Sequence, residues 1–240
     1  MPDLLPRNEQ HNPNPNVPAR PVVFDFPLVH MARRLDDGGP IRIVAIGSSS
    51  TAGADDGIAP YPGRLEFRLR DKYSKNSVLV LNRGKKGEEA PAELERFDSD
   101  VIGEAPTLVI WQVGTNVVYR GGNLNEVEQA IRSGVKKLSS EPMDVILMDL
   151  QYVPPLLTMD RVGATLQMVS AINDIASDAK VNVFRRFDFM RRWHRFERAS
   201  FDRAISPHDE NRLHQSDWST DRIAWALFKV IEHALPAGSS

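Results

Sequence analysis

The sequence contains no cysteine, which excludes disulfides, thiolate metal sites and a cysteine nucleophile. Neither sign of charge is in excess, because 30 lysine and arginine residues stand against 32 aspartates and glutamates, for a formal net charge of −2. A chain of this charge is not expected to offer nucleic acid a broad basic surface. Apolar runs of the roughly 18 to 20 residues needed to cross a bilayer are also absent, so no membrane span is predicted.

The first twenty residues, MPDLLPRNEQHNPNPNVPAR, are rich in proline and asparagine and lack the apolar stretch of a secretory signal. Proline disfavours a helix and the few apolar residues cannot build a core, so residues 1–24 are predicted to form an extended arm. Residues 25–237 are expected to form a single domain. We expect the chain to be soluble and cytoplasmic by default, or periplasmic or secreted if a leader has been removed; the sequence predicts no particular oligomeric state.

Short apolar runs alternate with segments of helical periodicity through most of the chain. The runs expected to be strands are residues 41–46, 78–81, 107–113, 144–150 and 181–184. The segments expected to be helices are residues 26–35, 62–73, 91–102, 125–139, 160–180 and 220–235. Near-continuous apolar strands between amphipathic helices indicate a parallel sheet covered on both faces. The predicted fold is therefore a three-layer α/β/α, flavodoxin-like arrangement with about five strands.

The loops that follow the strands of such a sheet lie at one edge, where open parallel sheets bind their ligands. After the first predicted strand comes Gly47-Ser48-Ser49-Ser50, which suits either a serine-rich helix N-cap or a serine nucleophile at a sharp bend. The loop has neither the GxGxxG pattern of dinucleotide-binding loops nor the GxxxxGK[ST] pattern of phosphate-binding loops. No organic cofactor is therefore predicted.

Glycine and polar residues recur after the later strands and just before the last helix. They are Asn82, Gly87, Gly114, Asn116 and His214. Taken singly, each is ordinary turn chemistry. Taken in order, a strand-exit serine, a glycine-bearing loop, a Gly-x-Asn and a late histidine resemble the SGNH (GDSL-like) hydrolase family over roughly residues 41–235.

The resemblance implies a role for each residue. Ser49 would be the nucleophile, and His214 would be the general base that takes its proton. The oxyanion would be held by the backbone amides of Ser49 and Gly87 and by the side chain of Asn116. Glycine at the second position lets a substrate approach the N–H closely, and a neutral amide at the third donates without attracting a proton. The resemblance also implies the α/β/α fold and hydrolysis of a carboxylic ester.

Two positions depart from the pattern of that family. Ser48 stands where the family usually has an aspartate, as in other GSSST-type first blocks, and Asn211 stands where its Asp-x-x-His block has the acid before the histidine. The second departure matters, because an acid behind the imidazole holds its tautomer and stabilises the imidazolium. Three interpretations are open: Asp209 or Glu210 supplies the acid, Asn211 orients His214 through its carbonyl, or the site has lost most hydrolytic activity.

Other residues are candidates for contact with a substrate near this edge. They are Ser48, Ser50, Tyr152, His208 and Asp209. The arginine-rich and aromatic residues 185–198 are predicted to form an amphipathic helix beside the site rather than a strip for nucleic acid, since acids interrupt the arginines. No metal is predicted, because no histidine and carboxylate pair has zinc-ligand spacing on one element.

The predicted function is that of a serine esterase acting on a carboxylic ester through an acyl-serine intermediate. A small acyl group such as acetyl, on a small molecule or a carbohydrate, is the favoured substrate. One alternative is an O-acetyltransferase, in which a sugar hydroxyl replaces water in the second half-reaction. Another, motivated by Asn211, is a catalytically impaired carbohydrate-binding protein on a hydrolase scaffold.

Overall fold

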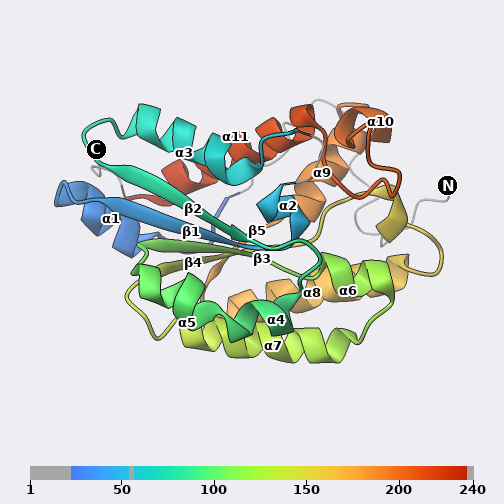
Figure 1. The fold of residues 1–240 in the computed structure, drawn as a ribbon, viewed down its shortest axis with the longest axis horizontal. Helices are drawn as coiled ribbons and strands as arrows, with labels where there is room; N and C mark the ends of the chain where they lie inside the picture. Colours follow the sequence, from blue (N-terminus) through green and yellow to red (C-terminus); the bar gives the residue numbers. More distant parts are fainter. Residues whose placement is uncertain (1–22, 54–56, 237–240) are drawn as a thin grey trace.

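A computed structural model describes residues 23–53 and 57–236, so most of the predicted arm lies outside the described residues. Five strands form one parallel sheet in the order β2-β1-β3-β4-β5 (Figure 1). The strands are β1 (Ile41–Gly47), β2 (Val78–Gly84), β3 (Leu108–Gln112), β4 (Asp144–Met148) and β5 (Asn182–Phe184). This order is the flavodoxin-like one, so the predicted fold is confirmed.

Helices cover both faces of the sheet (Figure 1). One face carries α3 (Tyr61–Lys72) and α11 (Asp217–Ala234), which pack against each other. The other carries α4 (Ala90–Glu95), α7 (Leu124–Leu138) and α8 (Val162–Ala179). Strands β3 and β4 are buried at every position because helices cover them on both sides and strands flank them on both edges. Their apolar runs therefore have no exposed face to alternate with.

The remaining helices have ten residues or fewer. They are α1 (Val29–Asp36), α2 (Ser49–Ala52), α5 (Phe97–Asp100), η2 (Ile102–Glu104), α6 (Thr115–Arg120), η3 (Pro154–Leu156), α9 (Arg186–Arg195) and α10 (Phe201–Ala204). Helices α2, α6, α9 and α10 gather where the strands end, and α1 lies at the opposite end (Figure 1).

Two predicted helices differ from the structure for local reasons. The helix predicted from residue 26 begins at Val29, because the backbone N–H and C=O of Phe26 bond to the side chain of Asn182 at 3.0 and 2.9 Å. The helix predicted over residues 91–102 is divided. Its break is at Arg96, whose φ of −103° and ψ of 11° leave the helical region and whose guanidinium pairs with carboxylates on both sides.

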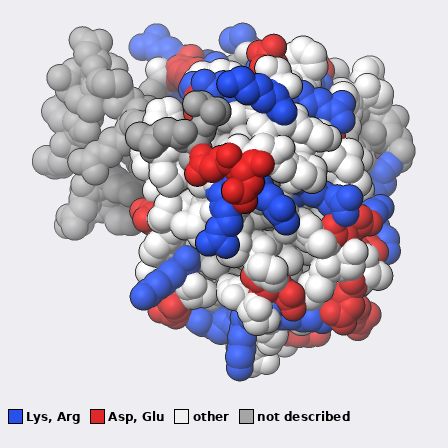
Figure 2. Space-filling view, turned by 90° about the vertical axis from the view of Figure 1, so that its left-hand side faces the viewer, with Lys and Arg blue, Asp and Glu red and all other residues white. Residues whose placement is uncertain are grey.

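At the end of the molecule where the strands begin, acidic and basic side chains are interspersed (Figure 2). An acidic group in the middle of this face has basic side chains beside it, so this face presents no broad surface of one sign. None of the helices in the described part of the chain combines the length and the apolar character that a bilayer span requires.

The core beside β3 is packed so closely that one helix position must be glycine. Trp111 on β3 is fully buried, and it meets Phe97 edge to face with ring centroids 4.8 Å apart. A Cβ on Gly134 of α7 would lie 2.4 Å from the indole ring of Trp111. Ring and helix therefore meet without space for a methyl group.

The first prediction concerns this contact. Gly134→Ala is expected to lower the free energy of unfolding by about 1–3 kcal/mol, since the added methyl group overpacks the core. Gly63→Ala on α3, where a Cβ would meet nothing within 4 Å, is the control. It should raise the free energy of unfolding by roughly 0.5–1 kcal/mol. Urea denaturation measures both, and equal effects of the two substitutions would contradict the packing described.

Candidate active site

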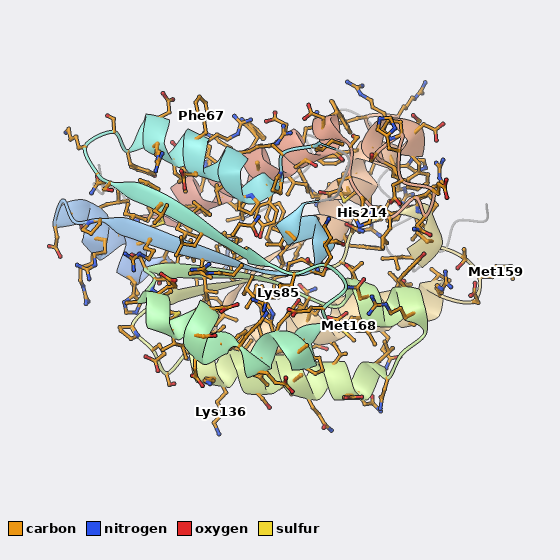
Figure 3. The ribbon with its side chains drawn as sticks, viewed as in Figure 1. Phe67, Lys85, Lys136, Met159, Met168 and His214 are labelled. Carbon is orange, nitrogen blue, oxygen red and sulfur yellow. The ribbon has the colours of Figure 1, made fainter. Side chains whose placement is uncertain are left out.

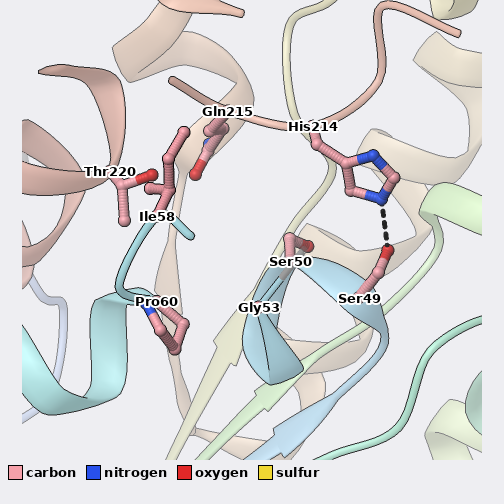
Figure 4. A pocket seen from close by; sticks show the side chains of 8 residues that line it. All are labelled: Ser49, Ser50, Gly53, Ile58, Pro60, His214, Gln215 and Thr220. Atoms are coloured by element: carbon pink, nitrogen blue, oxygen red, sulfur yellow. Dashed lines mark hydrogen bonds between the residues drawn. The ribbon is translucent and has the colours of Figure 1, made fainter. Parts of the chain in front are cut away.

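The turn between β1 and α2 presents a serine to a histidine. Ser49 is the first residue of α2, and its Oγ lies 2.9 Å from Nε2 of His214 (Figure 4). Both side chains are half-buried. Residues far apart in sequence thus meet at the end of the sheet where the strands terminate, and Figure 3 shows His214 there, beside α2.

The imidazole of His214 is held from its other side by a carboxylate. Its Nδ1 lies 3.0 Å from Oδ2 of Asp209. An ionised carboxylate only accepts, so Nδ1 donates to Asp209 and Nε2 is left to accept the proton of the Ser49 hydroxyl. The three side chains therefore form a connected Ser-His-Asp series, the arrangement in which a serine hydroxyl can be activated.

Asp209 is itself fixed by backbone donors of its own loop. The N–H groups of Leu213 and His214 donate to Oδ2 at 2.6 and 2.5 Å, and the N–H of Asn211 donates to Oδ1 at 3.1 Å. Burial alone would raise the pKa of Asp209, but these donors and the neighbouring imidazole hold the pKa of that carboxyl below its ordinary value. The carboxylate is therefore ionised at neutral pH.

The loop that carries the histidine is tied to the rest of the domain at several points. The N–H of Ser206 donates to the carbonyl of His214 at 3.0 Å, and the buried side chain of Gln151, just after β4, donates to the carbonyl of Leu213 at 2.5 Å. Ser216 ends the loop by capping α11. The position of the imidazole thus depends on β4 and α11 as well as on its own loop.

Of the residues considered as the partner of the imidazole, Asp209 is the one that contacts it. Asn211 is exposed, and its Oδ1 accepts a hydrogen bond from the hydroxyl of Tyr119 at 3.2 Å instead of contacting His214. The interpretation that Asn211 orients His214 through its carbonyl is therefore corrected. Glu210 is also exposed. The acid thus precedes the histidine by five residues and not by three. The sequence spacing did not indicate this, because it depends on the path of the loop.

Gly87 and Asn116, the predicted oxyanion donors, follow β2 and β3. Asn116 bonds to the residue after Gly87, and Gly87 bonds to a residue of the helix that carries Asn116. Asn116 is buried in α6, and its Nδ2 donates to the carbonyl of Glu88 at 2.7 Å, which uses one of its two N–H bonds. Gly87 has φ +78°, a left-handed conformation suited to glycine. The guanidinium of Arg120 donates to the carbonyl of Gly87 at 2.8 Å. This loop and α6 are thus locked together.

The last residues of β2 also support the serine turn, because the strand runs on past the predicted end at residue 81 to Gly84. Asn82 donates from Nδ2 to the carbonyl of Thr51 at 2.8 Å, which holds the end of α2. A Cβ on Gly84 would lie 2.3 Å from the backbone nitrogen of Ala52. The glycine therefore lets the end of β2 lie directly against the backbone of α2.

The predicted substrate contacts at Ser48 and Ser50 are corrected in part. Ser48 is buried, and its hydroxyl donates inward to Oε1 of Gln112 at 3.0 Å, so it does not face a substrate. The Ser50 hydroxyl also donates to Gln112, at 3.0 Å, although the residue lines a cavity beside Ser49. Both serine hydroxyls therefore bond to β3 instead of to a substrate beside Ser49.

The remaining candidates lie at different distances from this centre. Tyr152 is half-buried in an aromatic cluster, where its ring stacks on Phe201 at 5.8 Å and meets Phe187 edge to face at 5.2 Å. His208 is exposed in the loop before His214. The predicted helix within residues 185–198 is present as α9, at the same end of the sheet as the site (Figure 1).

A cavity of about 20 Å³ opens beside the serine and the histidine (Figure 4). Its lining residues are Ser49, Ser50, Gly53, Ile58, Pro60, His214, Gln215 and Thr220. Its wall opposite the Ser49–His214 bond is largely apolar, formed by Ile58 and Pro60 with the methyl-bearing Thr220. Within residues 23–53 and 57–236, no three His, Asp or Glu side chains come together in a group that could hold a metal ion.

Comparison with known proteins places the chain in a family. The model of the Non-GDSL lipase-like family matches residues 14–236, so the chain belongs to that family. No curated protein matches this chain.

Solved structures share the fold. Axe2, an acetylxylan esterase from Geobacillus stearothermophilus, is 21% identical with a TM-score of 0.67, over 80% of this chain and 95% of that chain. LAE5, an alpha/beta hydrolase enzyme from the metagenome of Lake Arreo, Spain, is 19% identical with a TM-score of 0.69, over the same shares of the two chains. Variants of Axe2 described as catalytic mutants replace a serine, an aspartate and a histidine by alanine.

The second prediction tests the anchoring of Asp209. Both carboxylate oxygens of Asp209 accept from backbone N–H groups. In Asp209→Asn the amide NH2 replaces one of these oxygens and sets two donors against each other. The free energy of unfolding should therefore fall by about 1–3 kcal/mol at neutral pH. Since the folded-state pKa is lowered, the stabilising effect of the carboxylate is present above the unfolded value of about 3.9 and is lost as the pH falls through the folded value. The difference between parent and variant should therefore shrink in acid.

The control for this prediction is Asp202→Asn. The Asp202 side chain is 80% exposed and pairs only with the surface residue Arg212 among its described ion pairs, at 2.7 Å. Its replacement should change the free energy of unfolding by less than about 1 kcal/mol. Thermal or urea unfolding from pH 3 to pH 8 follows both variants, and a pH-independent effect of Asp209→Asn would refute the charge-based account.

Proposed function

We propose that the protein is a serine esterase that hydrolyses carboxylic esters through an acyl-serine intermediate. The observation that carries the proposal is the continuous series from Ser49 Oγ to His214 Nε2 and from His214 Nδ1 to Asp209. Membership of a lipase-like family, and a fold shared with an acetylxylan esterase whose catalytic mutants alter a serine, an aspartate and a histidine, support it.

The first half-reaction forms the acyl-enzyme. Ser49 Oγ attacks the ester carbonyl carbon while its proton passes to Nε2 of His214, and the Asp209 carboxylate stabilises the imidazolium that results. The negative charge that develops on the carbonyl oxygen needs preorganised donors. We assign this role to the backbone N–H groups of Ser49 and Gly87 and to the second N–H of Asn116.

The tetrahedral intermediate collapses when its C–O bond to the alcohol breaks and the imidazolium returns its proton to the leaving oxygen. In the second half-reaction, water attacks the acyl carbon and gives its proton to His214 Nε2. The same proton then returns to Ser49 Oγ, and the carboxylic acid leaves. Proton and bond changes balance over the cycle without a cofactor.

We propose that the acyl group is small. The cavity beside Ser49 has a volume of about 20 Å³, little more than the roughly 10–15 Å³ that one water molecule occupies on the same measure. A methyl group fits such a space, whereas a longer chain would have to extend out of the cavity or displace Ile58 or Thr220. An acetyl ester is therefore the favoured substrate, and the likeness to an acetylxylan esterase makes acetylated carbohydrate the class to test.

The third prediction tests the assigned roles with p-nitrophenyl acetate. Ser49→Ala and His214→Ala should each lower kcat by roughly 10⁴-fold or more, and Asp209→Asn by about 10²- to 10⁴-fold.

Asn211 provides the matched control for this experiment. Asn211→Ala and Asn211→Asp should both leave kcat close to the parent, since the side chain contacts Tyr119 and not the imidazole. A large gain in Asn211→Asp would instead mean that the parent lacks an effective acid. A parent no faster than Ser49→Ala on this ester and on acetylated xylan oligosaccharides would refute the esterase proposal.

The fourth prediction tests the size of the acyl site. The parent should hydrolyse p-nitrophenyl acetate with a higher kcat/KM than the butyrate ester, and Ile58→Ala should narrow or reverse that ratio because it enlarges the cavity. Leu166→Ala, at a position on α8 that is 39% exposed, is the control and should leave the ratio unchanged. An unchanged ratio in Ile58→Ala would show that the acyl group lies elsewhere.

A further inference from the structure

The strongest feature outside the Ser-His-Asp series is a buried polar group behind the nucleophile turn. Gln112, the last residue of β3, is 1% exposed and directs its Oε1 at the turn. That one atom lies within hydrogen-bond distance of four donors: Ser48 N at 3.1 Å, Ser48 Oγ at 3.0 Å, Ser50 Oγ at 3.0 Å and Thr51 Oγ1 at 3.4 Å. Because a backbone N–H only donates, the atom facing it must be the amide oxygen.

The serine before the nucleophile is committed to this contact. Ser48 occupies the N-cap position of α2, where a serine side chain ordinarily accepts from an N–H of the first turn. Here it makes no cap hydrogen bond, and its hydroxyl donates to Gln112 instead. The serine-rich composition of the turn is therefore explained by its attachment to β3 and not by helix capping.

The serine after the nucleophile connects the same oxygen to a buried cation. The guanidinium of Arg186, at the start of α9, is fully buried, and its Nη1 donates to Ser50 Oγ at 3.2 Å. Ser50 thus accepts from Arg186 and donates to Gln112, which fixes the direction of its hydroxyl. Burial lowers the pKa of Arg186 to about 10, which leaves the group charged at neutral pH.

Arg186 is in turn anchored away from the site. Its Nε donates to the backbone carbonyl of Asp149 at 3.0 Å, just after β4, and the Asp149 carboxyl accepts from the N–H of Phe187 at 2.9 Å. The turn that carries Ser49 is consequently attached to β3 through Gln112 and to β4 and α9 through Arg186. Burying a guanidinium and a primary amide costs free energy, which these hydrogen bonds offset.

Glycine at position 47 makes the attachment possible. A Cβ there would lie 2.9 Å from Gln112 Oε1 and 2.7 Å from Thr51 Oγ1, so any side chain would displace the amide. The close approach of β1 to Gln112 is thus built into the backbone of the turn.

We propose that Gln112 and Arg186 are positioning residues that bind the hydroxyls on either side of Ser49 and thereby hold its Oγ at His214. The inference rests on the proposed function, because it takes Ser49 as the nucleophile. Neither residue touches the substrate in this account. Their effect is on the alignment of the attacking oxygen, so it should appear in kcat and in the rate at which Ser49 is modified, with KM unchanged.

The test compares variants that remove or retain the acceptor at position 112. Gln112→Met keeps the approximate volume but loses the acceptor, and it should lower kcat for p-nitrophenyl acetate by roughly 10- to 100-fold with KM within about twofold of the parent. Gln112→Glu retains an acceptor for the same donors and should recover part of that loss. Ser50→Ala breaks the link between Gln112 and Arg186 with little loss of volume and should also lower kcat.

A second measurement separates positioning from folding. Thr165→Val removes a buried hydroxyl on α8 that donates to the carbonyl of Leu156 at 2.7 Å, so it disturbs stability without reaching the turn. Its kcat should match the parent. The rate of inactivation by diethyl p-nitrophenyl phosphate, measured on folded protein with Tm recorded, should fall in Gln112→Met and in Ser50→Ala but not in Thr165→Val.

The outcomes distinguish this inference from the proposed function. If Ser49→Ala is inactive while Gln112→Met and Ser50→Ala keep the parent's kcat, the positioning roles are refuted and the esterase proposal stands. If KM rises with kcat unchanged, the turn contacts substrate and the inference is also refuted. If Ser49→Ala is as active as the parent, the proposed function itself fails.

Discussion

The geometry of the whole site depends on one carboxylate, that of Asp209. It accepts three backbone N–H groups of its own loop and the Nδ1 of His214, so it fixes the path of the loop and the tautomer of the imidazole at once. Backbone donors stabilise its ionised form. An ionised acceptor at Nδ1 is what leaves Nε2 available to Ser49, 2.9 Å away.

The two halves of the site are held to the sheet by different means. The histidine loop is tied by hydrogen bonds to β4 and α11, through Gln151 and Ser216. The serine turn is tied to β3 and α9 by buried polar side chains, of which Gln112 receives the most donors. Because the sheet joins both halves, small relative movements of the two reacting groups are resisted by the core itself. Preorganisation of this kind is what nucleophilic catalysis requires.

Most of the architecture could be predicted from the sequence because its signals are local. Apolar runs such as residues 107–113 have no polar alternation, which indicates a strand buried on both faces, and β3 is buried throughout. The helix over residues 91–102 was less predictable, since its division at Arg96 depends on carboxylates that reach the guanidinium only in the fold. Helix ends near Phe26 likewise depend on a side chain from β5.

The site was predictable where its residues follow strands and less so where a loop bends. Ser49, Gly87 and Asn116 each follow a strand of a parallel sheet, so topology alone puts them at one edge. The acid could not be selected among Asp209, Glu210 and Asn211, because the choice depends on a loop conformation set by backbone hydrogen bonds. The roles of Gln112 and Arg186 gave no signal, since one lies in a strand and the other begins a helix.

The nucleophile can be identified directly as the residue that a phosphorylating ester modifies. The protein treated with diethyl p-nitrophenyl phosphate would be digested and its peptides examined by mass spectrometry. We expect one diethylphosphoryl group per chain, on Ser49, and greatly slowed modification when Asp209 or His214 is replaced. A label on another residue, or none on the folded parent, would contradict the assignment of Ser49 as the nucleophile.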